Sequence, residues 1–153
     1  MDIKIRKANI DDAESLVEFN QEMAFETEGK RLDPETLAKG VNAVFTDGNK
    51  EFYVVAESED GRIAGGLMIV LEWSDWRNAW FWWISSVYVR PEWRGKRVYS
   101  RLYEFVKKLA SEQGNVHGFR LYVDLENERA QRVYEKLGME ASNYLLFGEN
   151  LKK

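Results

Sequence analysis

The fold of this chain is decided at residues 87–96, which read Val-Tyr-Val-Arg-Pro-Glu-Trp-Arg-Gly-Lys. The stretch from 79 to 89 is dense in Trp, Phe, Val and Tyr, a composition typical of a β-strand. After Pro91 the apolar spacing becomes that of a helix, which ends by Gly114. Its apolar residues fall on one stripe: Val98, Leu102, Phe105, Val106 and Leu109. The stretch therefore predicts a strand that turns directly into a helix.

Positive charge is concentrated at this turn, where residues 90–101 contain a single acid, Glu92. The cations are Arg90, Arg94, Lys96, Arg97 and Arg101. A helix N-terminus presents unpaired N–H groups and the positive end of its dipole, so cations gathered there favour phosphate binding. The alternative is a set of solvated charges that happen to flank a helix start. The glycines and the Lys-Ser/Thr pair of a Walker loop are missing.

The N-terminal third predicts one strand and two helices. Residues 3–5 alternate between apolar and charged like a short strand, and Asp11 and Glu14 have a capping-box spacing ahead of a helix. Asp33-Pro34 predicts an N-cap followed by proline at the first position of a second helix. That helix is expected to close near Asp47-Gly48.

The remaining elements are predicted from strand-like and turn-like runs. Residues 52–57 and 62–71 flank Glu59-Asp60-Gly61, so they predict an antiparallel hairpin, and residues 73–78 break the pattern before the strand at 79–89. The expected C-terminal elements are a strand at 118–125, a short helix from the N-cap Asn127 to the C′ glycine Gly138, and a last strand at Tyr144 to Phe147. The fold class is α/β, a central mixed sheet flanked by about four helices, in one domain over residues 1–153.

Composition excludes several classes of function. The 153 residues carry a formal charge of −4, which argues against a protein whose whole surface binds nucleic acid or anionic lipid. The absence of cysteine and the single histidine, His117, exclude thiolate chemistry and a histidine cluster for a metal. No apolar run approaches the length of a membrane span. We expect a cytoplasmic protein with no metal, no nucleic-acid partner and no membrane contact.

The turn at 87–96, together with Asn127, Ala130, Tyr134 and Gly138, resembles the GNAT superfamily of N-acetyltransferases. The resemblance extends over nearly the whole chain, from the start of the first strand to Met139. It implies the GNAT fold and acetyl-CoA as co-substrate. In that family the Arg-Gly-rich turn holds the pyrophosphate by backbone amides, the preceding strand pairs with the pantetheine arm, and the next parallel strand splays away. The implied cofactor-binding residues are Val87, Tyr88, Val89, Arg94, Gly95, Lys96, Arg97, Val98, Tyr99, Asn127, Ala130 and Tyr134.

Two residues depart from the family pattern. Arg97 stands where the phosphate loop usually carries glycine, and Tyr99 stands where it carries glycine or alanine. Any residue except proline keeps its backbone amide, so Arg97 retains anion binding and adds a charge. Tyr99 is expected to point away from the cofactor or to stack beside it.

The resemblance implies that Tyr134 gives a proton to the departing CoA thiolate. A phenol can do this when it is positioned for it. The alternative is that Tyr134 packs on the core face of a short helix beside Val133 and Leu137.

The proton of the attacking amine needs an acceptor, and the sequence points to Glu72. Related diamine acetyltransferases, which the chain also resembles around residues 67–96, carry a carboxylate on the strand before the phosphate loop, where this chain has Ser85 and Ser86. Serine can hold a water but cannot act as that base, so Ser85 is assigned to substrate binding. Glu72 and Asp75 are the nearest carboxylates in sequence, although residues near a hairpin tip are usually solvated.

An acidic ridge on the first helix suggests where a cationic amine binds. Glu14, Glu18, Glu22 and Glu26 are spaced four apart, and Glu28 follows. A solvated face is the alternative, since such a face tolerates the repulsion. The resemblance places the loop after this helix at the acceptor pocket, so Glu22, Glu26 and Glu28 are assigned to substrate binding.

All six tryptophans lie between Trp73 and Trp93. Three interpretations stay open: a heavily packed sheet, a homodimer interface, and an aromatic wall for an ammonium. His117 is expected in a loop, exposed and without a structural role.

The leading prediction is N-acetylation of a primary amine of a small molecule by direct transfer from acetyl-CoA in a ternary complex. The alternatives are a peptide or protein N-terminal acetyltransferase and a non-catalytic acyl-CoA-binding module. A homodimer is expected.

Overall fold

The computed structural model describes residues 2–47 and 51–152. The chain forms two compact units, residues 1–122 and 123–153, and each is described by itself. Gly48, the expected end of the second helix, lies outside the described residues. The prediction of a single domain remains a prediction.

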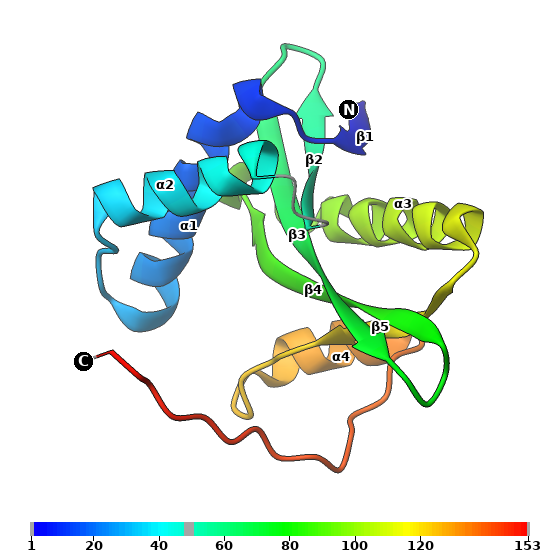
Figure 1. Ribbon diagram of the computed structural model, residues 1–153. Coiled ribbons are helices and arrows are strands. Elements are labelled where there is room, and N and C mark those ends of the chain that lie inside the picture. The colour runs from blue at the N-terminus through cyan, green and yellow to red at the C-terminus, as the bar shows by residue number, and fades with distance from the viewer. Residues whose placement is uncertain (1, 48–50, 153) are drawn as a thin grey trace. The chain divides into compact units, whose positions relative to one another are not determined.

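The first unit contains a five-stranded mixed sheet in the order β1-β2-β3-β4-β5 (Figure 1). Neighbouring strands are antiparallel except β4 and β5, which are parallel. The strand bounds are Ile3–Lys7, Phe52–Ser58, Ile63–Ser74, Ala79–Val89 and Val116–Leu121. The predicted mixed sheet is confirmed, and β5 ends four residues earlier than the predicted strand.

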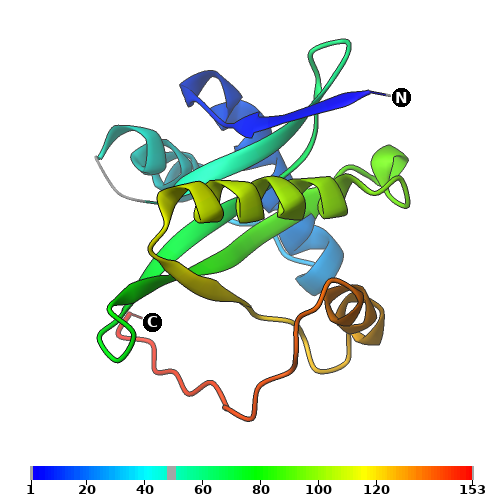
Figure 2. The same cartoon turned by 90° about the vertical axis from the view of Figure 1, so that its right-hand side faces the viewer.

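Helices α1 (Ala13–Glu28) and α2 (Pro34–Thr46) cover one face of the sheet, and α3 (Val98–Gln113) covers the other (Figures 1 and 2). On the first face Leu16 and Phe19 pack with Val41, Tyr53 and Val55. On the second face Tyr103 of α3 packs against Phe119 of β5, which contacts the buried Trp82. The sheet is therefore a layer between two apolar cores.

Local signals set the helix ends. Asp33 caps α2 by accepting the Thr36 N–H at 2.9 Å, with Pro34 next in the chain, as predicted. Helix α3 stops at Gly114, whose φ of +85° glycine adopts at little cost. The predicted cap of the first helix is wrong, because Asn9 and Asp12 form the capping box, at the 3₁₀ turn η1 (Ile10–Asp12) that precedes α1.

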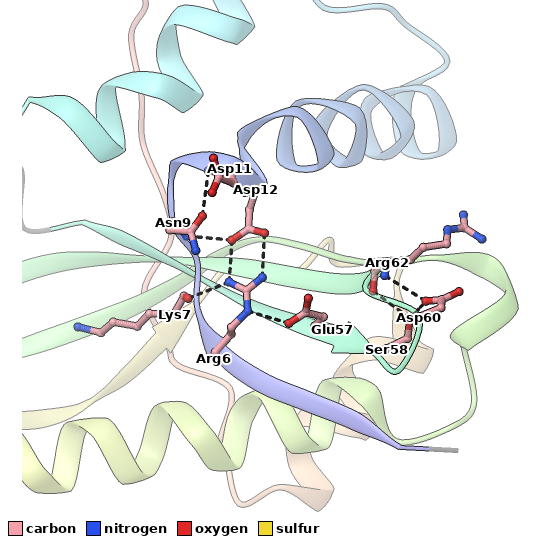
Figure 3. Close-up of polar contacts among 9 residues, drawn as sticks. All are labelled: Arg6, Lys7, Asn9, Asp11, Asp12, Glu57, Ser58, Asp60 and Arg62. Carbon is pink, nitrogen blue, oxygen red and sulfur yellow. Dashed lines mark hydrogen bonds and ion pairs between the residues drawn. The ribbon is translucent and has the colours of Figure 1, made fainter.

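Arg6 ties β1 to this turn (Figure 3). Its guanidinium donates two hydrogen bonds to Asp12, at 2.8 and 3.0 Å, and a third at 3.1 Å to Glu57 of β2. Burial alone would raise the pKa of Asp12, but the bonds from Arg6 and from the Asn9 N–H outweigh burial and lower it. The same view shows the predicted tight turn between β2 and β3, where Asp60 accepts from Ser58 and from the Arg62 N–H.

The second unit contains α4 (Glu128–Lys136). The strand predicted at Tyr144 to Phe147 is wrong, because these residues form no ladder with any described strand. A strand needs a neighbouring edge to satisfy its N–H groups, and the Tyr144 N–H instead meets the Ser142 hydroxyl at 3.3 Å. Across residues 2–47 and 51–152, no helix is long and apolar enough to cross a membrane.

Candidate active site

The two halves of β4 have different neighbours on the β5 side. The parallel ladder runs from Trp80, opposite Val116, to Ile84, opposite Leu121. Residues 85–89 have no partner on β5, both segments being within the described part of the chain. This half of β4 therefore offers a free backbone edge to a ligand.

A β-bulge marks the boundary between the two halves. Met68 of β3 lies opposite Ser85 and Gly66 lies opposite Tyr88, so three steps along β4 match two steps along β3. Ser86 takes the extra position with a φ of +51°, a conformation that serine seldom adopts. The bulge turns β4 as it leaves β5.

The direction of the free edge follows from one hydrogen bond. The Arg90 N–H donates to Ala64 of β3 at 2.8 Å. Successive residues of a strand turn their backbone groups to alternate edges, so Val89 and Val87 turn theirs away from β3. The Val89 carbonyl accepts from Arg94 Nε at 2.8 Å, which agrees with this direction. The N–H groups of Val87 and Val89 are the ones available to a ligand.

Gly65 of β3 lies against β4 on the side opposite the free edge. Its role was not predicted from the sequence. A Cβ at this position would lie 2.8 Å from the Tyr88 carbonyl oxygen and 3.2 Å from the Val89 Cα. Only glycine lets β3 approach β4 this closely without displacing it. The available signal was the pair Gly65-Gly66 inside a β-rich run, since glycine in a strand often marks close backbone approach.

The loop after β4 exposes backbone amides at the start of α3. It passes through a 3₁₀ turn, η2 (Pro91–Trp93), and reaches α3 with positive φ at Gly95 (+75°) and Arg97 (+66°). Within residues 2–47 and 51–152 no side chain caps α3, so its first-turn N–H groups remain for an anion.

Arg97 and Tyr99 are the two residues that depart from the family pattern. Arg97 holds a left-handed conformation, which explains why glycine is the usual residue there. The Tyr99 ring stacks on Tyr103 one turn further along α3, with centroids 6.3 Å apart. The Tyr99 side chain therefore lies along α3, beside Tyr103.

Arg94 is tied to the first helix. Its guanidinium forms an ion pair with Glu26 at 2.8 Å, and Glu26 also accepts the Tyr88 hydroxyl at 2.8 Å. Burial and this bond raise the pKa of Tyr88 to about 12. Burial would raise the pKa of Glu26, but the bonds from Tyr88 and Arg94 outweigh it and lower that pKa.

Three of the five glutamates named for the predicted acidic ridge and its end form ion pairs: Glu18, Glu26 and Glu28. Glu18 pairs with Arg90 at 2.8 Å and Glu28 pairs with Lys30 at 3.5 Å. Glu26 connects α1 to the loop rather than standing open to an amine. Glu22 contributes a charge near Tyr88, which adds to the raised pKa of that phenol.

Glu72 lies inside β3, not at the hairpin tip. It is opposite Phe81, which places it roughly 13 Å along the strand from the level of Ser85. Its carboxylate accepts from Arg120 at 2.8 Å and from the Trp83 indole at 3.1 Å. The structure does not bring Glu72 directly beside Ser85.

In the second unit, Asn127 caps α4. The Asn127 side chain accepts the Ala130 N–H at 3.1 Å, so this pair satisfies the helix start. Tyr134 is half-buried, and burial raises its pKa, which keeps the phenol protonated at neutral pH. Gly138 follows the helix with a φ of +97°, as predicted.

The tryptophans lie in different environments. Trp82 is buried and contacts Phe52 edge-on, with ring centroids 5.4 Å apart, whereas Trp76 is 90 % exposed. His117 is exposed as expected, but it lies in β5 rather than in a loop. It also accepts a hydrogen bond from Arg77 at 3.1 Å and contacts Phe81 edge-on, so the expectation that it has no structural role is wrong.

Comparisons with known proteins agree with this geometry. The family model described as Acetyltransferase (GNAT) family matches residues 13–139. The solved structure of a possible acetyltransferase from Clostridium difficile 630 is 39 % identical, with 99 % of each chain covered and a TM-score of 0.89. The chain therefore belongs to the GNAT acetyltransferase family.

More distant structures share the fold. A predicted acetyltransferase from Clostridium acetobutylicum, solved with acetyl-CoA, is 19 % identical over 99 % of each chain, with a TM-score of 0.78. The glucosamine-6-phosphate N-acetyltransferase of Arabidopsis thaliana is 22 % identical over 99 % of this chain and 100 % of its own, with a TM-score of 0.75.

Proposed function

We propose that the protein transfers an acetyl group from acetyl-CoA to a primary amine of a small molecule, directly and in a ternary complex. The observation that carries the proposal is the free edge at residues 85–89, which leads into the uncapped N-terminus of α3. The strand edge fits an amide-bearing arm and the helix start fits a phosphate group, and acetyl-CoA contains both.

In this proposal the backbone positions the co-substrate. Val87 and Val89 pair with the pantetheine amides, and the amides from Gly95 to Tyr99 hold the pyrophosphate. Lys96 and Arg97 add positive charge. Acetyl-CoA supplies an activated acetyl thioester that a neutral amine can attack.

Proton transfer is assigned to side chains. The amine gives up its proton while its nitrogen bonds to the acetyl carbon, and the carbon–sulfur bond breaks as the sulfur gains a proton. Tyr134 is the proposed donor because it matches the tyrosine to which the family resemblance assigns this step. Its raised pKa keeps it protonated at neutral pH but makes it a weaker acid, so the transfer depends on its position. Glu72 is the proposed acceptor through water, because its carboxylate is on the same sheet face as Ser85: its opposite residue, Phe81, and Ser85 are an even number of residues apart.

The test measures acetyl-CoA binding by calorimetry and CoA release with a panel of amines. Binding together with amine-dependent release supports the proposal. If acetyl-CoA binds but neither an amine nor a peptide N-terminus stimulates CoA release, the protein is a non-catalytic acyl-CoA-binding module. If only peptides stimulate CoA release, it is an N-terminal acetyltransferase.

A further inference from the structure

A cavity of about 610 Å³ lies between α2 and the sheet. Its floor is Tyr53 of β2 with Met68 and Val70 of β3. One wall is a stripe along α2 at helical spacing, formed by Thr36, Leu37, Gly40, Val41 and Val44. The volume falls in the usual range for small-molecule sites, and most of the lining side chains are apolar.

The floor of this cavity is beside the site proposed for acetyl transfer. Met68 is opposite Ser85 and Val70 is opposite Trp83. Neighbouring strands are about 4.8 Å apart, so the floor lies one strand away from the point where β4 leaves β5. An amine bound in the cavity has a short path to that point.

The charges of the lining select the sign of the ligand. Among the described lining residues there are two carboxylates, Asp33 and Glu51, and no Lys or Arg. Hydrogen bonds from Thr36 lower the pKa of Asp33, so it is charged at neutral pH. A second hollow, of about 480 Å³, lies at the β1 end, and its lining combines three arginines, Arg6, Arg62 and Arg90, with three carboxylates, Asp11, Asp12 and Glu57. Of these two sites, the cavity under α2 is the one whose lining has a net negative charge, which suits a cation.

We propose that the acceptor is an amphipathic primary amine whose uncharged aryl or branched alkyl body fills this cavity. The inference rests on the function proposed above. An apolar body buries the faces of Leu37, Val41 and Val44, whereas a sugar would place hydroxyls against side chains that cannot hydrogen-bond. A carboxylate or phosphate on the acceptor would be repelled by the carboxylates of Asp33 and Glu51.

Four amines test this inference with wild-type protein: 2-phenylethylamine, ethylamine, L-phenylalanine and glucosamine. 2-Phenylethylamine should show a kcat/KM at least about 100-fold above that of ethylamine, since both are monocations and only the apolar body differs. L-Phenylalanine keeps the body and the amine but adds a carboxylate, so its kcat/KM should be at least about tenfold below that of 2-phenylethylamine. Equal values within either pair, or a preference for glucosamine, would overturn the inference.

Two variants locate the body in the cavity. Gly40→Leu extends a side chain from the cavity stripe, and a Cβ there meets no atom of the described residues within 4 Å. Leucine also favours the helix, so the variant should fold. It should raise KM for 2-phenylethylamine at least about tenfold and leave acetyl-CoA affinity unchanged. Asn42→Leu, on the same helix but outside the cavity lining, is the control and should leave both unchanged.

The failure of this inference is distinguishable from that of the proposed function. If acetyl-CoA binds and some amine is acetylated, but Gly40→Leu and Asn42→Leu behave alike, the cavity is not the acceptor site. If no amine is acetylated, the proposed function fails and this inference fails with it. Calorimetric binding of 2-phenylethylamine that Gly40→Leu weakens supports the cavity without relying on turnover.

Discussion

The two halves of β4 belong to one strand but differ in their pairing. From Trp80 to Ile84 the strand is paired on both edges, and its aromatic side chains fill the cores and faces of the sheet. From Ser85 to Val89 it is bulged and paired only with β3, and it ends at a loop with positive φ angles. In the proposed function the first half supports the fold through its side chains, and the second half binds acetyl-CoA through its backbone.

This difference teaches where binding can be placed on a sheet. A fully paired segment has no spare N–H or C=O groups, so it can only support its neighbours. A segment that a bulge turns away from the neighbouring strand keeps unpaired N–H and C=O groups. The fully paired half next to it still restricts its motion. Substitutions should therefore affect stability in one half and binding in the other.

The largest expected effect is on stability, in the paired half. Trp82→Ala removes a buried ring that contacts Phe52 and Phe119, and it should lower the free energy of unfolding by about 3–5 kcal/mol. Denaturant unfolding measures this change. Trp82→Phe, which retains part of the packing, should lose less. In both variants the folded protein should bind acetyl-CoA within about twofold of wild type, and a selective loss of binding would break the comparison.

The next largest expected effect is on the rate of acetyl transfer. The proton donor proposed for this step, Tyr134, belongs to α4 and not to β4. Tyr134→Phe keeps the ring and removes the acid, so kcat should fall by about 100-fold or more while the acetyl-CoA Kd is unchanged. Because burial raises the pKa of Tyr134, wild-type activity should not decline from this group until the pH exceeds about 10. Tyr144→Phe, at an exposed tyrosine, is the control. Full activity in Tyr134→Phe would assign proton donation to water.

A matched pair of glycine variants sharpens the comparison at the end of the free half. Gly95 and Gly61 both have positive φ, and in the part of the chain that the structure describes a Cβ at either position meets no atom within 4 Å. Gly95→Ala and Gly61→Ala should each cost about 1–2 kcal/mol of stability from backbone strain. Only Gly95→Ala should weaken acetyl-CoA binding, by about tenfold. Wild-type affinity should fall as salt rises. Equal affinities in the two variants would remove the loop from the site.

The smallest effect is the pH dependence of the contact between α1 and the loop. The folded-state pKa of Glu26 is lowered, so its contribution to stability is present above about pH 4.3 and is lost as the pH falls through the lowered value. The stability difference between wild type and Glu26→Gln should therefore shrink between pH 7 and pH 3. Denaturant unfolding at both pH values measures it, and a constant difference would show that Glu26 does not stabilise the loop through its charge.

The sequence predicted the local elements well because their signals are local. The bounds of β4, the Asp33-Pro34 start of α2 and the Gly114 end of α3 follow from composition, capping and glycine chemistry. The first cap was assigned to the wrong pair because Asn9 and Asp12 have the same spacing as the predicted pair, Asp11 and Glu14.

What the sequence could not predict depends on long-range register. The partner of Glu26 is Arg94, 68 residues away, and the partner of Glu72 is Arg120, 48 residues away. No spacing rule reports such pairs, so both carboxylates were predicted to be open. The bulge at Ser86 and the close approach at Gly65 likewise depend on how β3 and β4 align.

Amide hydrogen exchange with and without acetyl-CoA tests most directly that the free half of β4 is the binding edge. We expect the Val87 and Val89 amides to exchange at least about tenfold more slowly at saturating acetyl-CoA. Trp82 and Ile84, in the half paired on both edges, should be protected in both states. If acetyl-CoA saturates the protein and the exchange of Val87 and Val89 does not change, the free edge of β4 is not where it binds.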